Sequence, residues 1–252
     1  MTSGTWMLFR RETARYFNVW MQTIIPPIVS AALFLFVFGH ALGGRIGTFG
    51  DVPYLTFLAP GLLIQGALTA AYSNTSSSLF DARRAGYIDD VLTSPLKDWQ
   101  ILVAYVSAAV GRALIVGFTT LLIALPVGGG WDINWPLFAL VLLLTNTAFA
   151  LIGMYVGLQA TRWDHVLVPV GFVLTPLTFL GGVFYPVSLL PPDLAAASKW
   201  NPILYVVDLT RAGLLGIHDL PIGSSLAVLG AFTVVLAVLV YRKWTTSPKL
   251  RG

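Results

Sequence analysis

The residue types that could carry chemistry are concentrated in one short segment, residues 81–98, which reads DARRAGYIDDVLTSPLKD. Long stretches with almost no charge flank it: residues 52–80 contain no Asp, Glu, Lys or Arg, and residues 99–131 contain only Arg112. A soluble domain is about 25% charged. The confinement of charge to short segments indicates membrane helices joined by water-facing loops, and we call residues 81–98 the charged island.

Few side chains in the chain could form an enzyme active site. The three histidines lie in separate predicted loops without metal-ligand spacing, and there is no cysteine. Glu12 is the one glutamate, which excludes a paired-glutamate acid–base site, and no G-x-S-x-G motif occurs. Asp89 and Asp90 lack further oxygen ligands nearby, so a solvated helix face explains them better than a metal site.

A P-loop nucleotide site is also excluded. No Lys in the chain is followed by Ser or Thr, so a Walker A loop is impossible. Any ATP that drives this protein must therefore be hydrolysed by another chain. The net charge of +4 does not predict nucleic-acid binding, because no basic stripe accompanies it.

The composition predicts one polytopic membrane domain. Only 10% of the 252 residues are charged, and the mean hydropathy is +0.79. A membrane helix needs about 20 apolar residues to cross a hydrocarbon core of about 30 Å. Charge-free windows of sufficient length predict six such helices, near residues 22–42, 55–79, 102–127, 136–160, 166–186 and 221–241.

The distribution of Lys and Arg predicts the orientation. With six spans both termini lie on one side, and that side receives 12 of the 15 basic residues. The other side receives only Arg45, Lys199 and Arg211. Because cytoplasmic loops carry an excess of Lys and Arg, we expect both termini and the charged island in the cytoplasm.

Residues 1–21 are expected to form a helix in the headgroup plane. Arg11 and Arg15 are four residues apart, with Glu12 beside them. An aromatic face opposite a basic face suits an interfacial helix, although the segment could also be the irregular start of the first span. The aromatic residues with helical spacing are Trp6, Phe9, Tyr16, Phe17 and Trp20.

The connection at residues 181–220, which we call the external segment, is apolar and too long for a simple turn. Prolines and glycines recur along it. This pattern favours short helices that enter the outer leaflet and return, which requires protein or a wet cavity around the broken backbone. An ordinary external loop with an amphipathic cap is the alternative.

Two polar features lie within predicted spans. Arg112 lies near the cytoplasmic end of the third span, so we expect its side chain to reach the headgroups, although a buried charge could also be functional. The hydroxyl-rich residues 72–78 are typical of close helix packing, and a place on a substrate path is the alternative.

The charged island is expected to be helical over residues 81–93. Asp81 suits the positive end of the helix dipole, and Pro95 disfavours helix at the preceding residue. On such a helix Tyr87, Ile88, Val91 and Leu92 form an apolar strip among charges of both signs. Mixed charges favour a protein partner over lipid, because a lipid-binding helix would be mostly basic.

The same residues resemble the coupling helix of ABC-2 type transporter permeases. The shared pattern comprises Arg84, Gly86, Asp89, residues 91–92 and residues 93–96, and the chain departs from it at Tyr87, where many members carry a small residue. The external segment also resembles that family in its order of Gly, Phe-Tyr-Pro, Leu-Pro, Asn-Pro, Tyr, Asp and Arg. Residues 22–27 and 43–47 are most similar to the YadH-like, NodJ and daunorubicin-permease branch.

The resemblance covers nearly the whole chain and implies an all-α polytopic membrane protein with the ABC-2 (type V) exporter fold. Residues 1–252 would form one transmembrane domain, with an interfacial helix at 1–21, a coupling-helix loop at 80–98 and re-entrant helices at 181–220. The partners implied are two copies of a separate ATP-binding cassette ATPase, a second copy of this chain and membrane lipids. Mg-ATP would be bound by the ATPase, and no cofactor or metal is expected in this chain.

The resemblance also assigns candidate site residues. Those expected to dock in the ATPase are Arg83, Arg84, Gly86, Tyr87, Ile88, Asp89, Val91, Leu92, Pro95 and Leu96. Candidates for a substrate path near spans one, two and five are Gln65, Thr69, Tyr72, Asn74, Thr175, Thr178 and Phe179. The external motif comprises Gly182, Phe184, Tyr185, Pro186, Pro191, Asn201, Pro202, Asp208 and Arg211.

The sequence therefore predicts the permease subunit of an exporter in the bacterial cytoplasmic membrane, which moves an amphipathic drug, lipid or lipid-linked saccharide. An ATP-independent secondary transporter or a membrane scaffold is the alternative. A proton-coupled carrier would be expected to place a carboxylate in mid-span. All eleven acids fall in predicted loops or in the N-terminal helix, which disfavours that mechanism. A membrane-embedded enzyme is a third possibility, disfavoured by the lack of acid–base groups.

Overall fold

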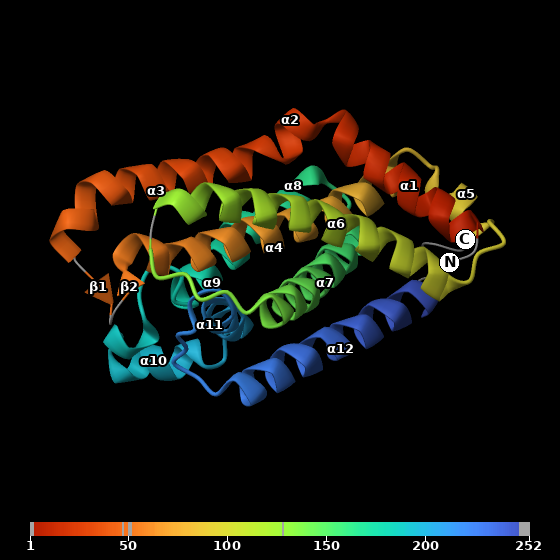
Figure 1. The fold of residues 1–252 in the computed structure, drawn as a ribbon. Helices are drawn as coiled ribbons and strands as arrows, with labels where there is room; N and C mark the ends of the chain where they lie inside the picture. The colour runs from red at the N-terminus through yellow and green to blue at the C-terminus, as the bar shows by residue number, and fades with distance from the viewer. Residues whose placement is uncertain (1–2, 47, 50–51, 128, 247–252) are drawn as a thin grey trace.

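The protein folds into an elongated bundle of helices in the computed structural model (Figure 1). The structure describes residues 3–46, 48–49, 52–127 and 129–246. Gly47, the last residue of the 43–47 motif, and the basic residues Lys249 and Arg251 lie outside the described part of the chain. The predicted all-helical class is confirmed, apart from the two-residue strands β1 (Thr48–Phe49) and β2 (Val52–Pro53), which pair antiparallel.

A helix occurs at each of the six places where the charge-free windows predict one. Within the described residues, five helical stretches are long and apolar enough to cross a membrane. The helix at the first window is α3, whose described apolar part is the shorter stretch Ile25–Phe38. The helices are α3 (Ile25–Ile46), α4 (Tyr54–Arg84), α6 (Asp98–Ala124, continued by η1, Leu125–Val127), α7 (Trp135–Gln159), the composite α8 (Trp163–Pro169), η2 (Val170–Leu174) and α9 (Thr175–Leu180), and α12 (Ile222–Thr246).

Helix α4 is at the centre of the bundle, and α7 packs closely against it. Thr75 donates a hydrogen bond from Oγ1 to the carbonyl of Ala150, at 2.7 Å. A methyl group on Gly153 would overlap the carbonyl of Tyr72, and one on Gly157 would lie 2.7 Å from the carbonyl oxygen of Ser76. The hydroxyl-rich residues 72–78 are therefore a close-packing surface, which confirms that interpretation of the sequence.

The N-terminal helix α1 (Ser3–Asn18) lies against α6 and is followed by the single turn α2 (Trp20–Thr23). The expected single aromatic face of α1 is wrong, because Tyr16 is buried while Trp6 and Phe17 are exposed. The buried stripe follows positions 5, 8, 12 and 16, a helical spacing that turns Glu12 inward.

The fifth helical stretch is irregular. A π-helical turn, η2, lies between Pro169 and Pro176, which each remove a backbone hydrogen-bond donor. The stretch ends at Leu180, earlier than the predicted residue 186, because Gly182 turns the chain with a positive φ of 75°. Most of this stretch lies outside the packed interior of the chain.

The external segment contains the short helices expected from its helix breakers. Helix α11 begins with Asn201 as its N-cap and Pro202 at its first position, and Gly216 ends it in the left-handed region. Twelve of its 14 residues are buried, against α4, α7 and α12. The helices are η3 (Val187–Leu189), α10 (Pro192–Ser198) and α11 (Pro202–Leu215).

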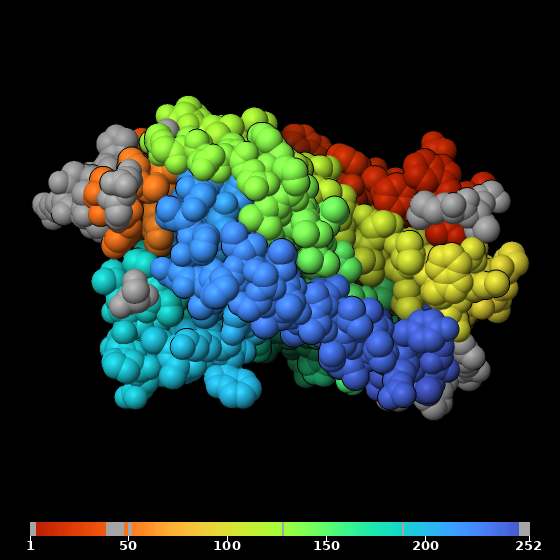
Figure 2. All heavy atoms as spheres, turned by 60° about the horizontal axis from the view of Figure 1, so that its bottom comes forward, coloured from red at the N-terminus to blue at the C-terminus, as the bar shows by residue number. Residues whose placement is uncertain are grey.

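The charged island does not form the expected continuous helix over residues 81–93. Helix α4 ends at Arg84, and Gly86, with a φ of 81°, turns the chain before the short helix α5 (Ile88–Leu92) begins. Glycine enters this left-handed conformation without a Cβ clash, so it breaks the helix where the local propensity would have continued it. The island and the external segment occupy opposite ends of the molecule (Figure 2).

Candidate functional site

The charged island has an inward apolar side and an outward polar side. Ile88 and Val91 are buried in a cluster with Leu8 of α1, and Tyr87, Leu92 and Leu96 pack against this cluster. Ile88 and Val91 of the expected apolar strip therefore face this chain, whereas Tyr87 and Leu92 stay half-exposed. The exposed residues of the island are Arg84, Ala85, Gly86, Asp89, Asp90, Thr93, Pro95 and Lys97.

A hollow of about 410 Å³ lies between the island and the turn that joins α7 to α8. Arg83, Arg84, Gly86 and Asp89 line one side of it, and Ala160 and Thr161 line the other. Arg83 donates to the carbonyls of Leu158, at 2.6 Å, and Ala160, at 3.3 Å. It thereby satisfies carbonyls left free at the end of α7 and fixes this turn against the island.

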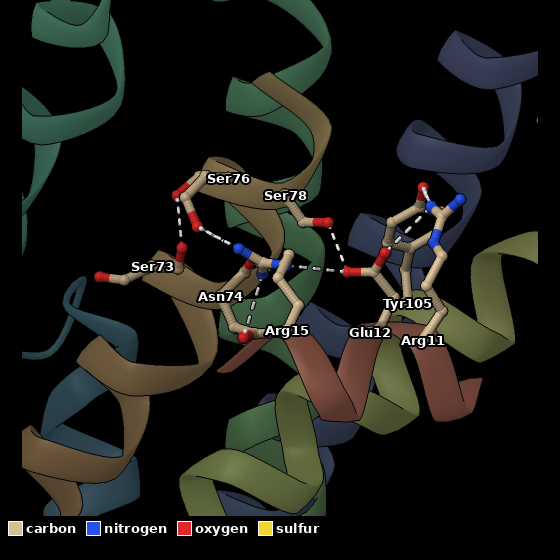
Figure 3. Close-up of polar contacts among 9 residues, drawn as sticks. Arg11, Glu12, Arg15, Ser73, Asn74, Ser76, Ser78 and Tyr105 are labelled. Atoms are coloured by element: carbon tan, nitrogen blue, oxygen red, sulfur yellow. Dashed lines mark hydrogen bonds and ion pairs between the residues drawn. The ribbon is translucent and has the colours of Figure 1, made fainter. Parts of the chain in front are cut away.

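A polar network that the sequence analysis did not assign connects α1 with α4 and α6 (Figure 3). The Glu12 carboxylate, 1% exposed, accepts hydrogen bonds from Ser78 Oγ, from Arg11 at 3.1 Å and from Arg15 at 3.2 Å. A buried charge requires such compensation. The sequence signal that could have revealed this network is the single glutamate of the chain, which lies between Arg11 and Arg15.

The two arginines extend this network to neighbouring helices. Arg15 donates to the Asn74 carbonyl at 2.8 Å, and Arg11 donates to the Tyr105 hydroxyl at 3.3 Å. The Arg11 guanidinium also lies over the ring of Tyr87, 5.1 Å from its centroid. Tyr87 thus connects the island to α1.

Arg11 and Tyr87 have the charge states that their contact requires near neutral pH. Burial acts to lower the pKa of Arg11, but Tyr105 and Glu12 outweigh that effect and raise the pKa above its usual value. Burial also raises the pKa of the Tyr87 phenol. Arg11 is therefore a cation and Tyr87 is neutral, which is the combination that a cation–π contact requires.

Arg112 does not reach the headgroups as expected. Its side chain is buried, at 7% exposure, and donates to the carbonyl of Thr23 at 2.7 Å. Thr23 ends α2, so this hydrogen bond attaches the junction of α2 and α3 to α6. Packing of α1 over α6 removes the route along which the side chain could have extended.

Two of the predicted substrate-path residues share an open cleft. Gln65 and Thr69 of α4 line a cleft of about 280 Å³ whose other wall is α3, including Pro27, Ser30 and Phe34. The lining is mainly apolar, with the three polar side chains of Ser30, Gln65 and Thr69 among it, and this combination suits an amphipathic molecule.

The other predicted path residues are divided between the interior and the surface. Tyr72, Asn74 and Thr178 are buried, and the Tyr72 hydroxyl donates to the carbonyl of Val166 at 3.1 Å. These three residues therefore do not line the cleft. Thr175 is half-buried and donates to the carbonyl of Val170 at 2.9 Å, within the π-helical turn.

An aromatic cluster brings Phe179 to the same region as α3. Phe179 stacks on Phe184 at 5.0 Å between ring centroids, and Phe184 lies 5.8 Å from Phe34. Phe34 also lines the cleft with Gln65. The structure thus joins α3, α4 and α9 at one face, and the repeated phenylalanines of the first span were the available signal for Phe34.

Arg211 anchors the external segment. It is buried, with its guanidinium 3.7 Å from the ring centroid of Phe57, and it donates to the carbonyls of Gly182 at 2.6 Å and Val183 at 3.1 Å. These contacts attach α11 to α4 and to the turn after α9. The external motif therefore has a structural function at this end of the bundle.

The remaining motif residues make local contacts. Asn201 donates to the carbonyl of Leu177 at 2.6 Å, and Tyr185 donates to the carbonyl of Phe179 at 2.8 Å. The Asp208 carboxylate accepts hydrogen bonds from the backbone of residues 219 and 220. Pro186, Pro191 and Pro202 each precede or begin a short helix.

The five long apolar helices and their buried polar contacts define a multi-pass integral membrane protein. The sequence profile of the ABC-2 type transporter family matches residues 3–215. The chain belongs to this family and is an ABC-2 permease.

Curated relatives agree with this assignment. The inner membrane transport permease YadH of Escherichia coli K12 is 36% identical over 245 residues, which cover 97% of this chain and 94% of the relative. Nodulation protein J of Sinorhizobium fredii is 29% identical, over 82% of this chain and 80% of the relative. Nodulation protein J of Rhizobium leguminosarum bv. viciae is 27% identical, over 92% of this chain and 88% of the relative.

Proposed function

We propose that this chain is the permease subunit of an ATP-binding cassette exporter in the bacterial cytoplasmic membrane. Two copies would form the path for an amphipathic drug, lipid or lipid-linked saccharide, and two copies of a separate ATPase would hydrolyse Mg-ATP. Family membership supports the transport class. The observation that carries the coupling proposal is the charged island, whose polar side is exposed while its apolar side is fixed against α1, α4 and α6.

The geometry suits a docking element. A partner that presses on the island meets a face of both charges, with Arg84 and Asp89 beside the hollow of about 410 Å³. Arg83 joins that hollow to the end of α7, so a displacement of the island would also reach α7 and α8. Because packed interfaces switch between discrete arrangements, such a contact can transmit a two-state change.

The fold supports the proposed orientation with both termini in the cytoplasm. Trp244, near the end of α12, donates to Asp98 at the start of α6, at 3.1 Å. Gly4 near the start of α1 lies against Leu96 of the island. Both ends of the described chain therefore lie beside the island, at the end of the bundle that carries most of the basic residues.

The proposed substrate surface consists of Gln65, Thr69 and Phe179 with Phe34, on the face shared by α3, α4 and α9. Gln65 and Thr69 would contact the polar part of the substrate, and the phenylalanines its apolar part. Alternation of the paired permeases between two arrangements would expose this surface to each side in turn.

Co-purification with the ATPase tests the docking proposal. We expect the double reversal Arg84→Glu with Asp89→Arg to reduce recovery of the ATPase about tenfold or more, because like charges placed opposite each other cost several kcal/mol. The matched control is Lys199→Glu with Asp193→Arg, two exposed positions at the opposite end of the bundle. Equal recovery with both double variants would refute docking at the island.

Transport without nucleotide would favour the ATP-independent alternative. The purified permease is reconstituted in proteoliposomes with and without the ATPase, with a fluorescent short-chain phospholipid as the probe. The proposal expects movement of the probe that requires both the ATPase and Mg-ATP. Movement by the permease alone at the same rate would overturn it.

A further inference from the structure

Helix α3 is attached to the bundle along one narrow line. Within Ile25–Phe38 only Ala31 and Leu35 are buried, and they lie about one turn apart on the same side of the helix. Both belong to one cluster with Leu58 of α4 and Ala124 of α6, at the edge of the bundle (Figure 1). A helix held along a single line leaves a recess on each side, and one of these recesses is the open cleft between α3 and α4.

The recess on the other side of α3 has a volume of about 650 Å³. Every residue that lines it is aliphatic or a phenylalanine, whereas the lining of the cleft includes Ser30, Gln65 and Thr69. The two sides of α3 therefore differ in chemistry. We call this recess the apolar groove, and its walls include Val29, Leu33 and Phe36 of α3, Leu55 of α4, and Ile123 and Val127 of α6.

The depth of the apolar groove corresponds to one leaflet of the bilayer. Leu55 lies at the start of α4 and Val127 at the end of η1, both at the end of the bundle that carries the external segment. At about 1.5 Å per residue, the wall from Val29 to Phe36 is about 10 Å long, which is two-thirds of the roughly 15 Å of hydrocarbon in one leaflet. The groove therefore extends from that end towards the middle of the membrane.

The groove is continuous with the apolar surface that the protein presents to lipid. Leu33 and Phe36 are exposed on α3, and Leu122, beside Ile123, is exposed on α6. Water is absent at this depth, and an unfilled recess would lose dispersion contacts along its walls. We propose that an acyl chain of a bilayer phospholipid occupies the apolar groove and completes the packing of α3 against α4 and α6.

An acyl chain fits the groove better than two other occupants. A substrate with a polar part would leave that part without a partner, because all the described residues that line the groove are apolar. A second copy of this chain is expected on the other side of α3, where the cleft and the aromatic cluster of Phe34, Phe179 and Phe184 lie. The surrounding bilayer supplies the remaining class of molecule.

The preference of a chain for the groove comes from packing. Lipid tails are as apolar as leucine, so the hydrophobic effect does not distinguish the groove from the rest of the lipid-facing surface. A chain in the groove touches three helices, whereas a chain on a flat surface touches one. About ten additional atom contacts would favour the groove about fivefold. The site is independent of the proposed coupling to an ATPase.

Photo-crosslinking tests this assignment. The full chain is reconstituted in vesicles of phosphatidylethanolamine and phosphatidylglycerol, and the probe is a phosphatidylethanolamine with a diazirine midway along one acyl chain. After illumination, modified peptides are quantified by mass spectrometry. We expect labelling of Leu33 and Phe36 to exceed that of Val234 and Val235 on α12 about fivefold. All four side chains are similarly exposed, at 55% to 62%, so exposure alone would give equal labelling.

A variant that fills the groove separates a lipid site from ordinary lipid contact. Ala32 lines the groove, so Ala32→Phe places a ring in the space of the acyl chain. We expect labelling at Leu33 and Phe36 to fall about fivefold, to the level of α12. The matched control Ala231→Phe, at an exposed position of α12, should leave the labelling unchanged. Ala32→Leu fills less of the groove and should give a smaller decrease.

Removal of lipid gives a second readout that a folding defect would not reproduce. Washing with detergent should lower the Tm of the unchanged protein and of Ala231→Phe, and added phosphatidylethanolamine should restore it. The Tm of Ala32→Phe should respond less to added lipid, because the ring replaces the chain. A variant with a folding defect would instead have a low Tm both with and without lipid.

Two results would overturn the lipid site. Equal labelling of the groove and of α12 in the unchanged protein would show that the groove holds no preferred chain. The chain contains no cysteine, so disulfide formation between two copies of Leu33→Cys permease would assign the groove to contact with a second copy. Neither result bears on docking of the ATPase at the island, which is tested separately.

Discussion

The packing of α4 against α7 leads to a sharp prediction about a single methyl group. Gly153→Ala would place its Cβ against the carbonyl of Tyr72 and the hydroxyl of Thr75. The carbonyl belongs to the backbone of a buried helix, so it cannot rotate away. We therefore expect the two helices to separate and the protein to lose thermal stability.

The magnitude follows from two opposing effects. Overpacking a well-packed interior costs about 1–3 kcal/mol. Replacing Gly by Ala within a helix recovers up to about 1 kcal/mol through helix propensity. Because the overlap is with backbone atoms of Tyr72, we take the upper end of the overpacking cost, which leaves a net loss of about 2 kcal/mol. Each kcal/mol shifts Tm by roughly 2–4 °C in a chain of this size, so we expect a decrease of roughly 4–8 °C.

The matched control is Gly230→Ala in α12, where an added Cβ meets nothing within 4 Å. This variant should be neutral or more stable by up to about 1 kcal/mol. Both proteins are purified in the same detergent, and unfolding is followed by far-UV circular dichroism during heating at one scan rate. An equal Tm for Gly153→Ala and Gly230→Ala would refute the close-packing interpretation of residues 72–78.

Two further predictions concern backbone conformation and a buried charge. Gly86→Ala and Gly130→Ala each place a Cβ at a positive φ (81° and 80°) with open space around it, at a cost of about 1–2 kcal/mol. We expect only Gly86→Ala to weaken co-purification of the ATPase, and equal effects would contradict this. Arg211→Met leaves the carbonyls of Gly182 and Val183 without their donor, so we expect Tm to fall by several degrees. The control Lys199→Met, at an exposed site, should leave Tm unchanged. An unaltered Tm in both variants would show that the Arg211 guanidinium does not anchor the external segment.

The positions of the helices could be predicted from the sequence because hydropathy is a local property. Each charge-free window is long enough to require a helix, and a helix occurs at each place. Helix breakers and caps such as Asn201–Pro202 and Gly216 also act within a few residues, so the short helices of the external segment could be anticipated. Whether these helices enter the membrane stays a prediction.

The incorrect expectations concern the directions in which side chains point. The island carries the right residues for an amphipathic helix, but Gly86 divides it and its apolar side packs on α1. Arg112 was expected to extend along its own helix, but α1 packs over α6 and α2 supplies the Thr23 carbonyl as its partner. The break at Gly86 is local, but the packing partners, Leu8 for the island and Thr23 for Arg112, lie far away in the sequence.

The sequence by itself determined the membrane class, the family and the places of the helices, because composition, hydropathy and short motifs depend only on neighbouring residues. The tertiary structure alone decided that Glu12 is enclosed by Arg11, Arg15 and Ser78, and that Tyr87 reaches Arg11. Ser78 is 66 residues from Glu12, so no local pattern could pair them. The physical reason is that burial and charge compensation depend on which helix faces are packed together, and that arrangement is settled only when the whole bundle forms.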